Sequence, residues 1–427
     1  MLLWYFLLVL AISVVEPQQN ESTTEEFGSD DPFYPTLEWS DVFDWKLLTV
    51  LSRKSPNILF SPASLQLVLS ILYEASSGAT QNNFEDTLQY ITKKSIREKT
   101  RRTIDALHVS PTSENRLSLS TRIFLDSKIR IKDIYAKKIK DNYNTDVFPS
   151  NFTDTEATSA TINAWASEYT QGAIKRLTEP DDVRDMIMLL ANAIHFKGVW
   201  RYPFPKNETC VGGFYTNPGT KIYVPFMTTT NLFYFLESQV LEAKILRLPY
   251  KGNRFSMFLI LPFAQGGLPA LLEKVNLLNL HRELHYLDRR AVLVSIPKFS
   301  FKLKASYKGV LQEFGLTKIF QNSASFTGIA EGNSKLLREL VVSDILQSAG
   351  IDVDEEGTVA FAATDVIIGN KIGVPENVFN ATHPFIFFIQ DDNSGTILFL
   401  GKVDSPLYQD LEIKKELDDI EKDFQST

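Results

Sequence analysis

Apolar positions recur at helical spacing in the first half of the chain and in short strand-like runs in the second half. Apolar residues that return every three or four positions predict helices at 41–51, 61–74, 81–90, 95–107 and 151–171. Ser61 followed by Pro62 is typical of a helix cap with proline at the first helical position, so the second helix is expected to begin there.

From about residue 184 onward, runs rich in β-branched and aromatic residues predict strands at 185–196, 232–236, 243–248, 255–261, 291–301, 385–389 and 397–403. The turn residues at 391–395 mark a hairpin between the last two runs. Helices that precede strands, without regular βαβ alternation, predict an α+β fold with largely antiparallel sheets. We find no repeat and no low-complexity linker that would divide the body into domains.

The N-terminus predicts a secreted protein. Residues 2–15 are apolar apart from Ser13, and polar residues follow, as in a signal peptide that would occupy about 1–17. The run is shorter than the roughly 20 residues that a membrane helix needs, so no membrane partner is expected. Sequons for N-glycosylation agree with an extracellular product; they lie at Asn20, Asn151, Asn207 and Asn380.

Charge and cysteine content exclude further classes. The net charge is -8, and residues 16–44 hold nine acidic and no basic residues. We interpret 18–40 and 404–427 as acidic extensions of a body at 41–403, and we expect no nucleic-acid partner. Cys210 is the only cysteine, so no intrachain disulfide can form, and a buried or idle thiol in a monomer is expected.

Motifs for catalysis are absent from the sequence. There is no Gly-x-Ser-x-Gly elbow, His-Glu-x-x-His, P-loop or dinucleotide fingerprint among the 427 residues. His281 and His285 have the i, i+4 spacing of a metal site, but a solvated helix is the favoured interpretation. We therefore assign no catalytic residue, metal or cofactor, and an extracellular hydrolase is kept only as a control hypothesis.

Segment 352–384 carries the most functional information. It opens with acidic residues and Gly357, continues with small residues, and then has an apolar run that leads to Lys371. An ordinary surface loop is the plain interpretation, but loops of this length are uncommon and usually functional. The run from Glu355 to Thr358, with the small residues that follow, resembles the hinge of the reactive-centre loop in inhibitory serpins; those residues are Ala360, Ala362, Ala363 and Thr364.

Further motifs in family order strengthen the resemblance to serpins over about 41–403. They are NILFSPAS at 57–64, NAIHFKGVW at 192–200, IPKF at 296–299, FGLTKIF at 314–320, HPFIFF at 383–388 and FLGKV at 399–403. The resemblance implies a single-domain serpin fold, with about nine helices around three mostly antiparallel β-sheets and an exposed reactive-centre loop. It also implies that a cleaved loop inserts as a new strand into the middle of a sheet.

The hinge residues suit this mechanism, because an inserting strand alternates its side chains between two faces. The small residues Thr358, Ala360, Ala362 and Thr364 would share the inner face, where they avoid overpacking. Phe361 departs from the usual small hinge residue. Phe361 would share the other, more exposed face of the inserted strand with Val359, Ala363 and Asp365, where a bulky side chain should cost less. Its size therefore puts the rate of insertion in question, but not insertion itself.

The resemblance places the reactive bond between Lys371 and Ile372, at the family's fixed count beyond hinge residue Gly357. Lys371 is also the only basic residue between Thr358 and His383. A lysine there favours a trypsin-like serine protease as the partner. A Lys-Ile-Gly sequence is similar to arthropod serpins that restrain clip-type proteases in immune and melanisation cascades. The alternative is a non-inhibitory serpin-fold binding or carrier protein.

Three supporting clusters are also implied by the resemblance. Trp200, Lys298 and Glu355 match the top of the family's main sheet, the breach, where a Lys298–Glu355 ion pair is expected. Ser61, Ser64 and Asn192 match the polar cluster beneath the sheet, the shutter, with Gln347 at a place where the family often has histidine. A basic run matches the helix that binds heparin-like polyanions in some serpins, and helical spacing places Lys94, Arg97 and Arg101 on one face, although a solvated face is the plain interpretation. The run comprises Lys93, Lys94, Arg97, Lys99, Arg101 and Arg102.

Overall fold

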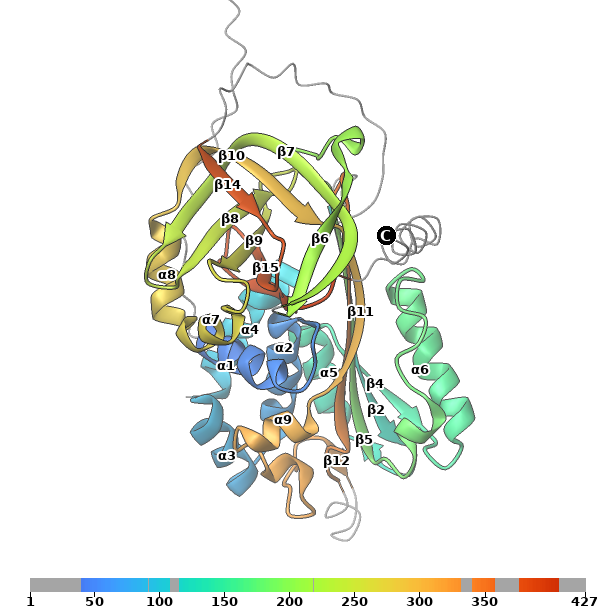
Figure 1. Cartoon of the computed structure of the whole chain (residues 1–427). Helices are drawn as coiled ribbons and strands as arrows, with labels where there is room; N and C mark the ends of the chain where they lie inside the picture. The colour runs from blue at the N-terminus through green and yellow to red at the C-terminus, as the bar shows by residue number, and fades with distance from the viewer. Residues whose placement is uncertain are drawn as a thin grey trace, which may run out of the picture. The chain divides into compact units, whose positions relative to one another are not determined.

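The computed structural model describes residues 40–90, 92–107, 115–217, 219–331, 340–357 and 376–406. This part of the chain has nine α-helices and three β-sheets, which confirms the predicted α+β fold (Figure 1). The predicted signal peptide, most of both acidic extensions and the reactive-centre loop from 358 to 375 lie outside the described residues.

A five-stranded sheet forms the centre of the fold. Its strand order is β11 (Phe299–Ser306), β13 (Asp344–Val353), β5 (Met188–Gly198), β2 (Asn115–Asp126) and β4 (Asp146–Ser150). The pairs β11–β13 and β2–β5 are antiparallel, whereas β13–β5 and β2–β4 are parallel. This sheet is thus mixed, whereas most strand pairs of the described residues are antiparallel, as predicted.

A nine-stranded sheet packs beside it. Its main path runs through β1 (Ile58–Phe60), β16 (Ile397–Val403), β15 (Phe385–Asp391), β9 (Phe255–Pro262), β8 (Ala243–Pro249), β7 (Thr220–Ser238), β10 (Asp288–Pro297) and β14 (Asn377–Asn380), and β6 (Cys210–Asn217) pairs with β7. All of its pairs are antiparallel except β10–β14. A small sheet joins β3 (Arg130–Ile131) to β12 (Ala330–Glu331).

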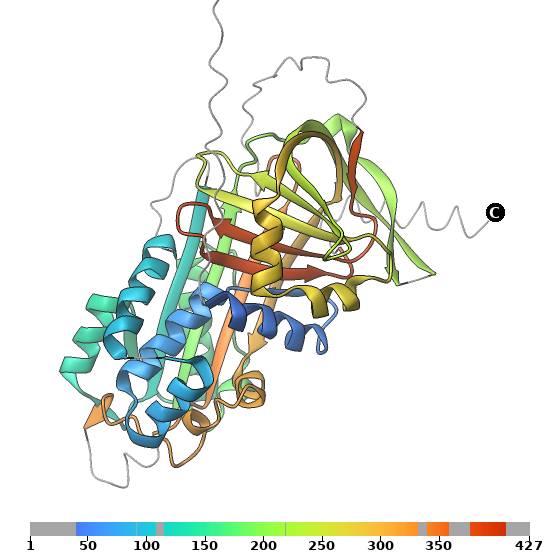
Figure 2. The ribbon, with the colours of Figure 1, turned by 90° about the vertical axis from the view of Figure 1, so that its left-hand side faces the viewer.

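The helices surround these sheets. They are α1 (Ser40–Ser52), α2 (Pro62–Ala75), α3 (Gly78–Leu88), α4 (Lys93–Leu107), α5 (Asp133–Tyr143), α6 (Thr155–Tyr169), α7 (Leu268–Lys274), α8 (Leu277–His285) and α9 (Lys308–Glu313), with 3-10 turns at Pro180–Val183, Lys206–Glu208 and Lys318–Phe320. Helix α2 begins as predicted, because Ser61 caps it by accepting a hydrogen bond from the Ser64 amide. Figure 2 shows α1 to α4, in blue, gathered together.

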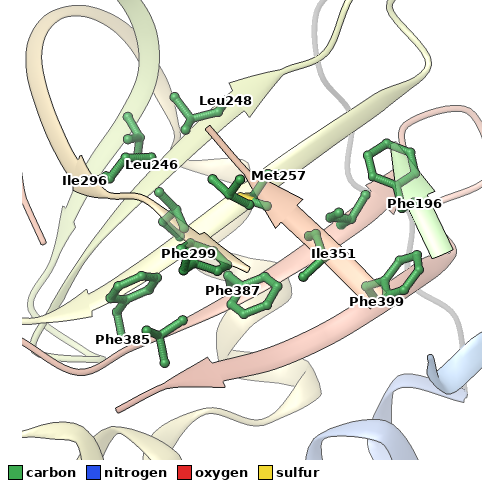
Figure 3. Close-up of a cluster of buried hydrophobic side chains, with 14 of the residues drawn as sticks. Phe196, Leu246, Leu248, Met257, Ile296, Phe299, Ile351, Phe385, Phe387 and Phe399 are labelled. Atoms are coloured by element: carbon green, nitrogen blue, oxygen red, sulfur yellow. The ribbon is translucent and has the colours of Figure 1, made fainter. Parts of the chain in front are cut away.

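Two apolar clusters bury the faces of the five-stranded sheet. The larger joins Phe196 and Ile351 to side chains of the nine-stranded sheet such as Met257, Phe387 and Phe399 (Figure 3). The smaller packs Leu189, Ala191, Ala193 and Leu346 against Ile162 and Trp165 of α6. Burial of both faces explains why the first half of β5, from Met188 to Ile194, is almost entirely apolar and does not alternate with polar residues.

Several expectations differ from the structure. The run predicted as one strand at 291–301 is two strands in different sheets, β10 and β11, which meet at Lys298. Helix α5 and strands β2 and β13 were not predicted. Cys210 is exposed at the start of β6, so the thiol is not buried, and that it is idle stays a prediction. Among the described residues, no helix is long and apolar enough to cross a membrane.

Candidate functional site

A tight turn ends β13 and reverses the chain just before the undescribed loop. The Asp354 amide donates to the Gly357 carbonyl at 2.9 Å, and the Gly357 amide donates to the Asp354 carbonyl at 3.3 Å. The Asp354 carboxylate also accepts from the amides of Glu356 and Gly357. On its other side, Gly357 pairs in antiparallel fashion with Val199, directly after β5. The turn thus lies against the ends of both β13 and β5.

Gly357 is required in this turn for two reasons. Its φ of +122° lies in the region that side-chain-bearing residues rarely adopt. A Cβ atom at this position would lie 2.1 Å from the carbonyl oxygen of Gly198 and 2.7 Å from the Trp200 amide nitrogen. Any larger residue would therefore push the turn away from β5.

The carboxylate of Glu355 is held from two sides. Lys298 Nζ lies 3.0 Å from one carboxylate oxygen and 3.2 Å from the other, and the Thr209 hydroxyl donates at 2.7 Å. Both charged residues are buried. Burial by itself would raise the pKa of Glu355, but the hydrogen bonds from Thr209 and Lys298 outweigh it and lower the pKa below its ordinary value. The pair joins the turn to the junction of β10 and β11.

Trp200 and Lys206 complete this contact. The Trp200 indole donates to the Asp354 carbonyl at 2.9 Å, its amide donates to the Glu356 carbonyl, and its ring stacks on Tyr250 with centroids 4.3 Å apart. Lys206 Nζ lies 2.5 Å from the Glu356 carboxylate. The structure brings Trp200, Lys298 and Glu355 together and adds Thr209 and Lys206. These two were missed because no pattern within 206–209 indicates partners near residue 355.

Replacing Lys298 by methionine is expected to weaken the turn. Removing one partner of a buried ion pair costs about 3 kcal/mol of unfolding free energy. Because the folded pKa of Glu355 is lowered, its ionisation contributes stability above its ordinary value of 4.5, and that contribution is lost as pH falls through the lower folded value. Protonated Glu355 needs no ion pair, so the substitution should lower the melting temperature most at pH 7, and the difference from the unmodified protein should shrink as pH falls.

Thermal unfolding between pH 3 and 7 measures both effects. Lys302→Met, which removes an exposed lysine from β11, serves as the matched control. Equal melting temperatures for the two variants at pH 7, with the same dependence on pH, would show that the Lys298–Glu355 pair does not hold the turn.

A buried polar cluster connects β5 and β13 further along the strands. Asn192 of β5 and Gln347 of β13 are direct partners in the parallel ladder. Gln347 Nε2 donates to Ser64 Oγ at 2.8 Å, to Asn192 Oδ1 at 3.2 Å and to the Ser61 carbonyl at 3.1 Å, while its Oε1 accepts from the Ser61 amide. Ser64 also donates to Asn192 at 2.9 Å. The structure thus joins Ser61, Ser64, Asn192 and Gln347 in one network.

Two further hydroxyls belong to this network and were not predicted. Tyr307 donates to Gln347 Oε1 at 3.0 Å, and Thr121 accepts from Asn192 Nδ2 at 2.8 Å. Burial raises the pKa of Tyr307 well above its ordinary value, so the phenol stays a neutral donor. Fully paired networks of this kind fix strand position, and each bond must re-form if the strands move apart.

A third contact joins β5 and β13 on the opposite face. His195 lies 3.4 Å from the Asp352 carboxylate, which also accepts a hydrogen bond from Ser300 of β11. Burial raises the pKa of Asp352, but these two hydrogen bonds outweigh that and lower it. Gly350 is the neighbour of His195 in the ladder, and a Cβ there would lie 2.7 Å from the imidazole ring.

The basic residues of α4 do not share one face. Arg97 Nε pairs with the buried Glu74 carboxylate at 3.0 Å, which Lys138 of α5 also contacts, and Lys93 donates to the carbonyls of Glu74 and Ser76. Lys94 is exposed and pairs with Glu98. Lys99 and Arg102 lie toward α1. The single face expected for Lys94, Arg97 and Arg101 is thus divided, because Glu74 draws Arg97 inward.

The other predicted residues are found as follows. Asn151, Asn207 and Asn380 are exposed. His281 and His285 lie in α8 with ring centroids 4.5 Å apart, and no three metal-ligating residues cluster in the parts of the chain described above. Outside the described residues lie Lys371, Ile372, Thr358, Ala360, Ala362, Thr364 and Asn20.

Known proteins resemble this chain over most of its length. A family described as "Serpin (serine protease inhibitor)" matches residues 40–406. "Serine protease inhibitor 2" of Anopheles gambiae is 34% identical over 84% of this chain and 89% of the relative. Serpin48 of the insect Tenebrio molitor, titled "a highly specific serpin", aligns with a TM-score of 0.76 and 28% identity over 86% of this chain and 97% of its own. Human thyroxine-binding globulin, solved with thyroxine, aligns with a TM-score of 0.79 and 25% identity over 86% and 98%.

Proposed function

Because this chain belongs to the serpin family, we propose that it is a secreted inhibitor that traps trypsin-like serine proteases when they cleave between Lys371 and Ile372. Relatives named as serine protease inhibitors support inhibition rather than catalysis. The observation that carries the proposal is the pairing of the turn at 354–357. This turn lies against the ends of β5 and β13, which are parallel neighbours.

The pairings of Gly357 define where an inserted loop would lie. Gly357 pairs with Val199 beside β5 and with Asp354 beside β13, and these two strands are parallel neighbours. A strand that continues from Gly357 would run antiparallel to both. Insertion would replace one parallel pair by two antiparallel pairs, which are slightly more stable per residue, and would add a strand's backbone hydrogen bonds. The uncleaved fold would therefore be metastable.

Continuing this register gives each loop residue two neighbours. Ala360 would lie between Phe196 and Ile351, and Ala362 between Ile194 and Ala349, all four of which are fully buried. Side chains larger than alanine would overpack this inner face. Thr364 would lie between Asn192 and Gln347, where its hydroxyl could replace hydrogen bonds that separate when the strands part.

The same strand register predicts the neighbours of Phe361 in the inserted loop. Phe361 would lie between His195 and Gly350 on the outer face, so that one neighbour has no side chain and the other is a partly exposed ring. Its bulk therefore has room. Further along, the outer neighbours Ala191, Ala193 and Leu346 are covered by α6, so α6 would have to move during insertion. The outer face is exposed only near the hinge.

The length of the strands suits removal of the protease from its docking position. Ile368 would lie opposite Met188, the first residue of β5, and Lys371 would lie beyond that end. The segment from Thr358 to Lys371 would span roughly 45 Å when extended. A protease acylated at Lys371 would be carried across the whole sheet, and its active site would be distorted before water hydrolyses the acyl bond.

The biological setting is proposed from the sequence. A lysine at the reactive bond suits the carboxylate-containing specificity pocket of a trypsin-like protease. The similarity of Lys371-Ile372-Gly373 to arthropod serpins is the ground for proposing a clip-type protease of an immune or melanisation cascade as the target, and insect serpins are among the relatives. The exposed Asn151, Asn207 and Asn380 would carry glycans in the extracellular space. If α4 binds a heparin-like polyanion, Lys94 and Arg101 are the suitable residues, since Glu74 occupies Arg97.

A carrier function is the second candidate, because thyroxine-binding globulin has the same fold. The two functions predict different responses to cleavage. An inhibitor gains a central strand, so cleavage after Lys371 should raise the melting temperature by more than about 10 °C, given roughly 2–4 °C per kcal/mol for a large domain. A non-inserting carrier should be cut at the same bond with an unchanged melting temperature. Differential scanning calorimetry of intact and trypsin-nicked protein distinguishes them.

A further inference from the structure

A cavity of about 530 Å³ opens between α1, α2 and α4, away from the hinge and the sheet strands. Residues 87–90, at the C-terminal end of α3, and Phe314 complete its wall. Its volume lies within the range of small-molecule sites, about 300–1,000 Å³. The side chains that matter for its chemistry divide into an apolar floor and a basic rim.

The floor of the cavity is apolar, so it offers few hydrogen-bonding groups to a ligand. Leu67, Leu69 and Ile96 are buried there, and Val42, Phe43 and Leu88 are half-buried along its sides. The polar groups between them are already paired. Thr100 donates to the Ile96 carbonyl at 2.7 Å and lies 3.0 Å from the Ser70 hydroxyl, and Ser70 donates to the Gln66 carbonyl.

Tyr90 adds an aromatic surface at one side of the cavity. Its ring stacks parallel to Phe84 and lies edge-on to Tyr73, with centroids 6.2 and 5.0 Å away. Burial raises the pKa of Tyr90 to about 12, so it carries no charge near neutral pH. An aliphatic chain can therefore replace water over this floor without leaving an unpaired polar group behind.

The rim carries basic side chains, with the buried Asp44 close behind them. Lys46 of α1 and Lys99 and Arg102 of α4 line the cavity, and no aspartate or glutamate is among its lining residues. Lys99 and Arg102 also border a neighbouring cavity that includes the buried Asp44. The positive charge of these two side chains therefore acts on both cavities. Lys99 and Arg102 lie on the side of α4 that faces α1, whereas Arg97 on the other side pairs with Glu74. The opening is thus basic even though the floor is apolar.

We propose that this cavity binds an amphipathic anion with one aliphatic chain, such as a fatty acid carboxylate. The chain would cover the floor, and the head group would lie near Lys46, Lys99 and Arg102. Each buried methylene should improve affinity about fourfold, which a wholly polar sulfated polymer cannot exploit. None of the cavity's lining residues belongs to the hinge turn at 354–357, and the proposal does not depend on the proposed inhibitory function.

Calorimetric titration of the full chain with sodium dodecanoate, below its micelle concentration, tests the site. We expect one binding site, with dodecanol binding about tenfold more weakly because it lacks the charge. Lys99→Glu combined with Arg102→Glu should weaken dodecanoate binding about tenfold or more. The matched control, Lys94→Glu with Arg101→Glu, changes the net charge equally on the outer side of α4 and should alter the affinity less than about twofold.

Three outcomes would overturn the proposal: no saturable binding, equal binding of dodecanol and dodecanoate, or equal weakening by the two double variants. Thermal unfolding confirms that each variant folds. Should the Lys99 and Arg102 variant fail to fold, Lys46→Glu on the exposed side of α1 takes its place, with the same expected loss and the same contradicting result.

Discussion

Replacement of Lys371 by alanine is expected to abolish the covalent complex that we propose with trypsin, and to leave the melting temperature of the uncleaved protein unchanged. Trypsin-like specificity pockets hold a buried carboxylate that a substrate lysine satisfies, and alanine leaves it unpaired. Loss of such a contact lowers the rate of acylation by about 10³-fold or more. No other lysine or arginine lies between Thr358 and His383, so no neighbouring residue can replace Lys371. Denaturing electrophoresis after incubation with trypsin measures the complex.

Lys371→Arg is the control, because arginine satisfies the same pocket and should preserve the complex. Lys371→Phe should transfer the complex from trypsin to chymotrypsin, since the loop that inserts is unchanged. A Lys371→Ala protein that still forms the trypsin complex would show that another bond is the reactive one, while the fold and the family membership would stand.

A glutamate in place of Ala360 is expected to turn the proposed inhibitor into a substrate of trypsin. In the register set by Gly357, residue 360 would face Phe196 and Ile351 beneath the sheet, and both are fully buried. An unpaired carboxylate there costs several kcal/mol, so insertion would be slower than deacylation. Trypsin should then cleave after Lys371 and be released active. A titration that plots residual trypsin activity against the molar ratio of serpin to trypsin measures this effect. It shows what fraction of the cleaved serpin molecules trap the protease.

Val359→Glu is a matched control one residue away. Residue 359 would lie on the outer face between Lys197 and Asp352, both partly exposed, where a carboxylate remains hydrated. This variant should trap trypsin at nearly the ratio of the unmodified protein. If the two variants behave alike, the inserted loop does not follow the register inferred from the hinge.

Local patterns predict those elements whose partners are near in sequence. The cap at Ser61 and Pro62 marks the start of α2, and the turn at 391–395 marks the β15–β16 hairpin. The strand β13 was missed because it is buried on both faces and its neighbours β5 and β11 come from other parts of the chain. The break at Lys298 was missed because β10 and β11 form one continuous pattern and diverge only through tertiary packing.

The candidate site likewise contains residues that sequence motifs predict and residues that they do not. Trp200, Lys298 and Glu355, and likewise Ser61, Ser64 and Asn192, were proposed through family motifs, and the structure brings the members of each set together. Thr209, Lys206, Tyr307 and Thr121 carry no motif, since their roles depend on contacts across long sequence separations. Arg97 shows the converse: helical spacing placed it on an open face, but buried Glu74 on α2 attracts it.

The central claim is that cleavage after Lys371 triggers insertion that traps the protease. Mass spectrometry of the products formed with equimolar trypsin, combined with denaturing electrophoresis, tests it most directly. The account predicts a complex that survives denaturation, together with a released C-terminal peptide that begins at Ile372. A peptide that begins at Ile372 without any stable complex, and with trypsin fully active, would contradict it.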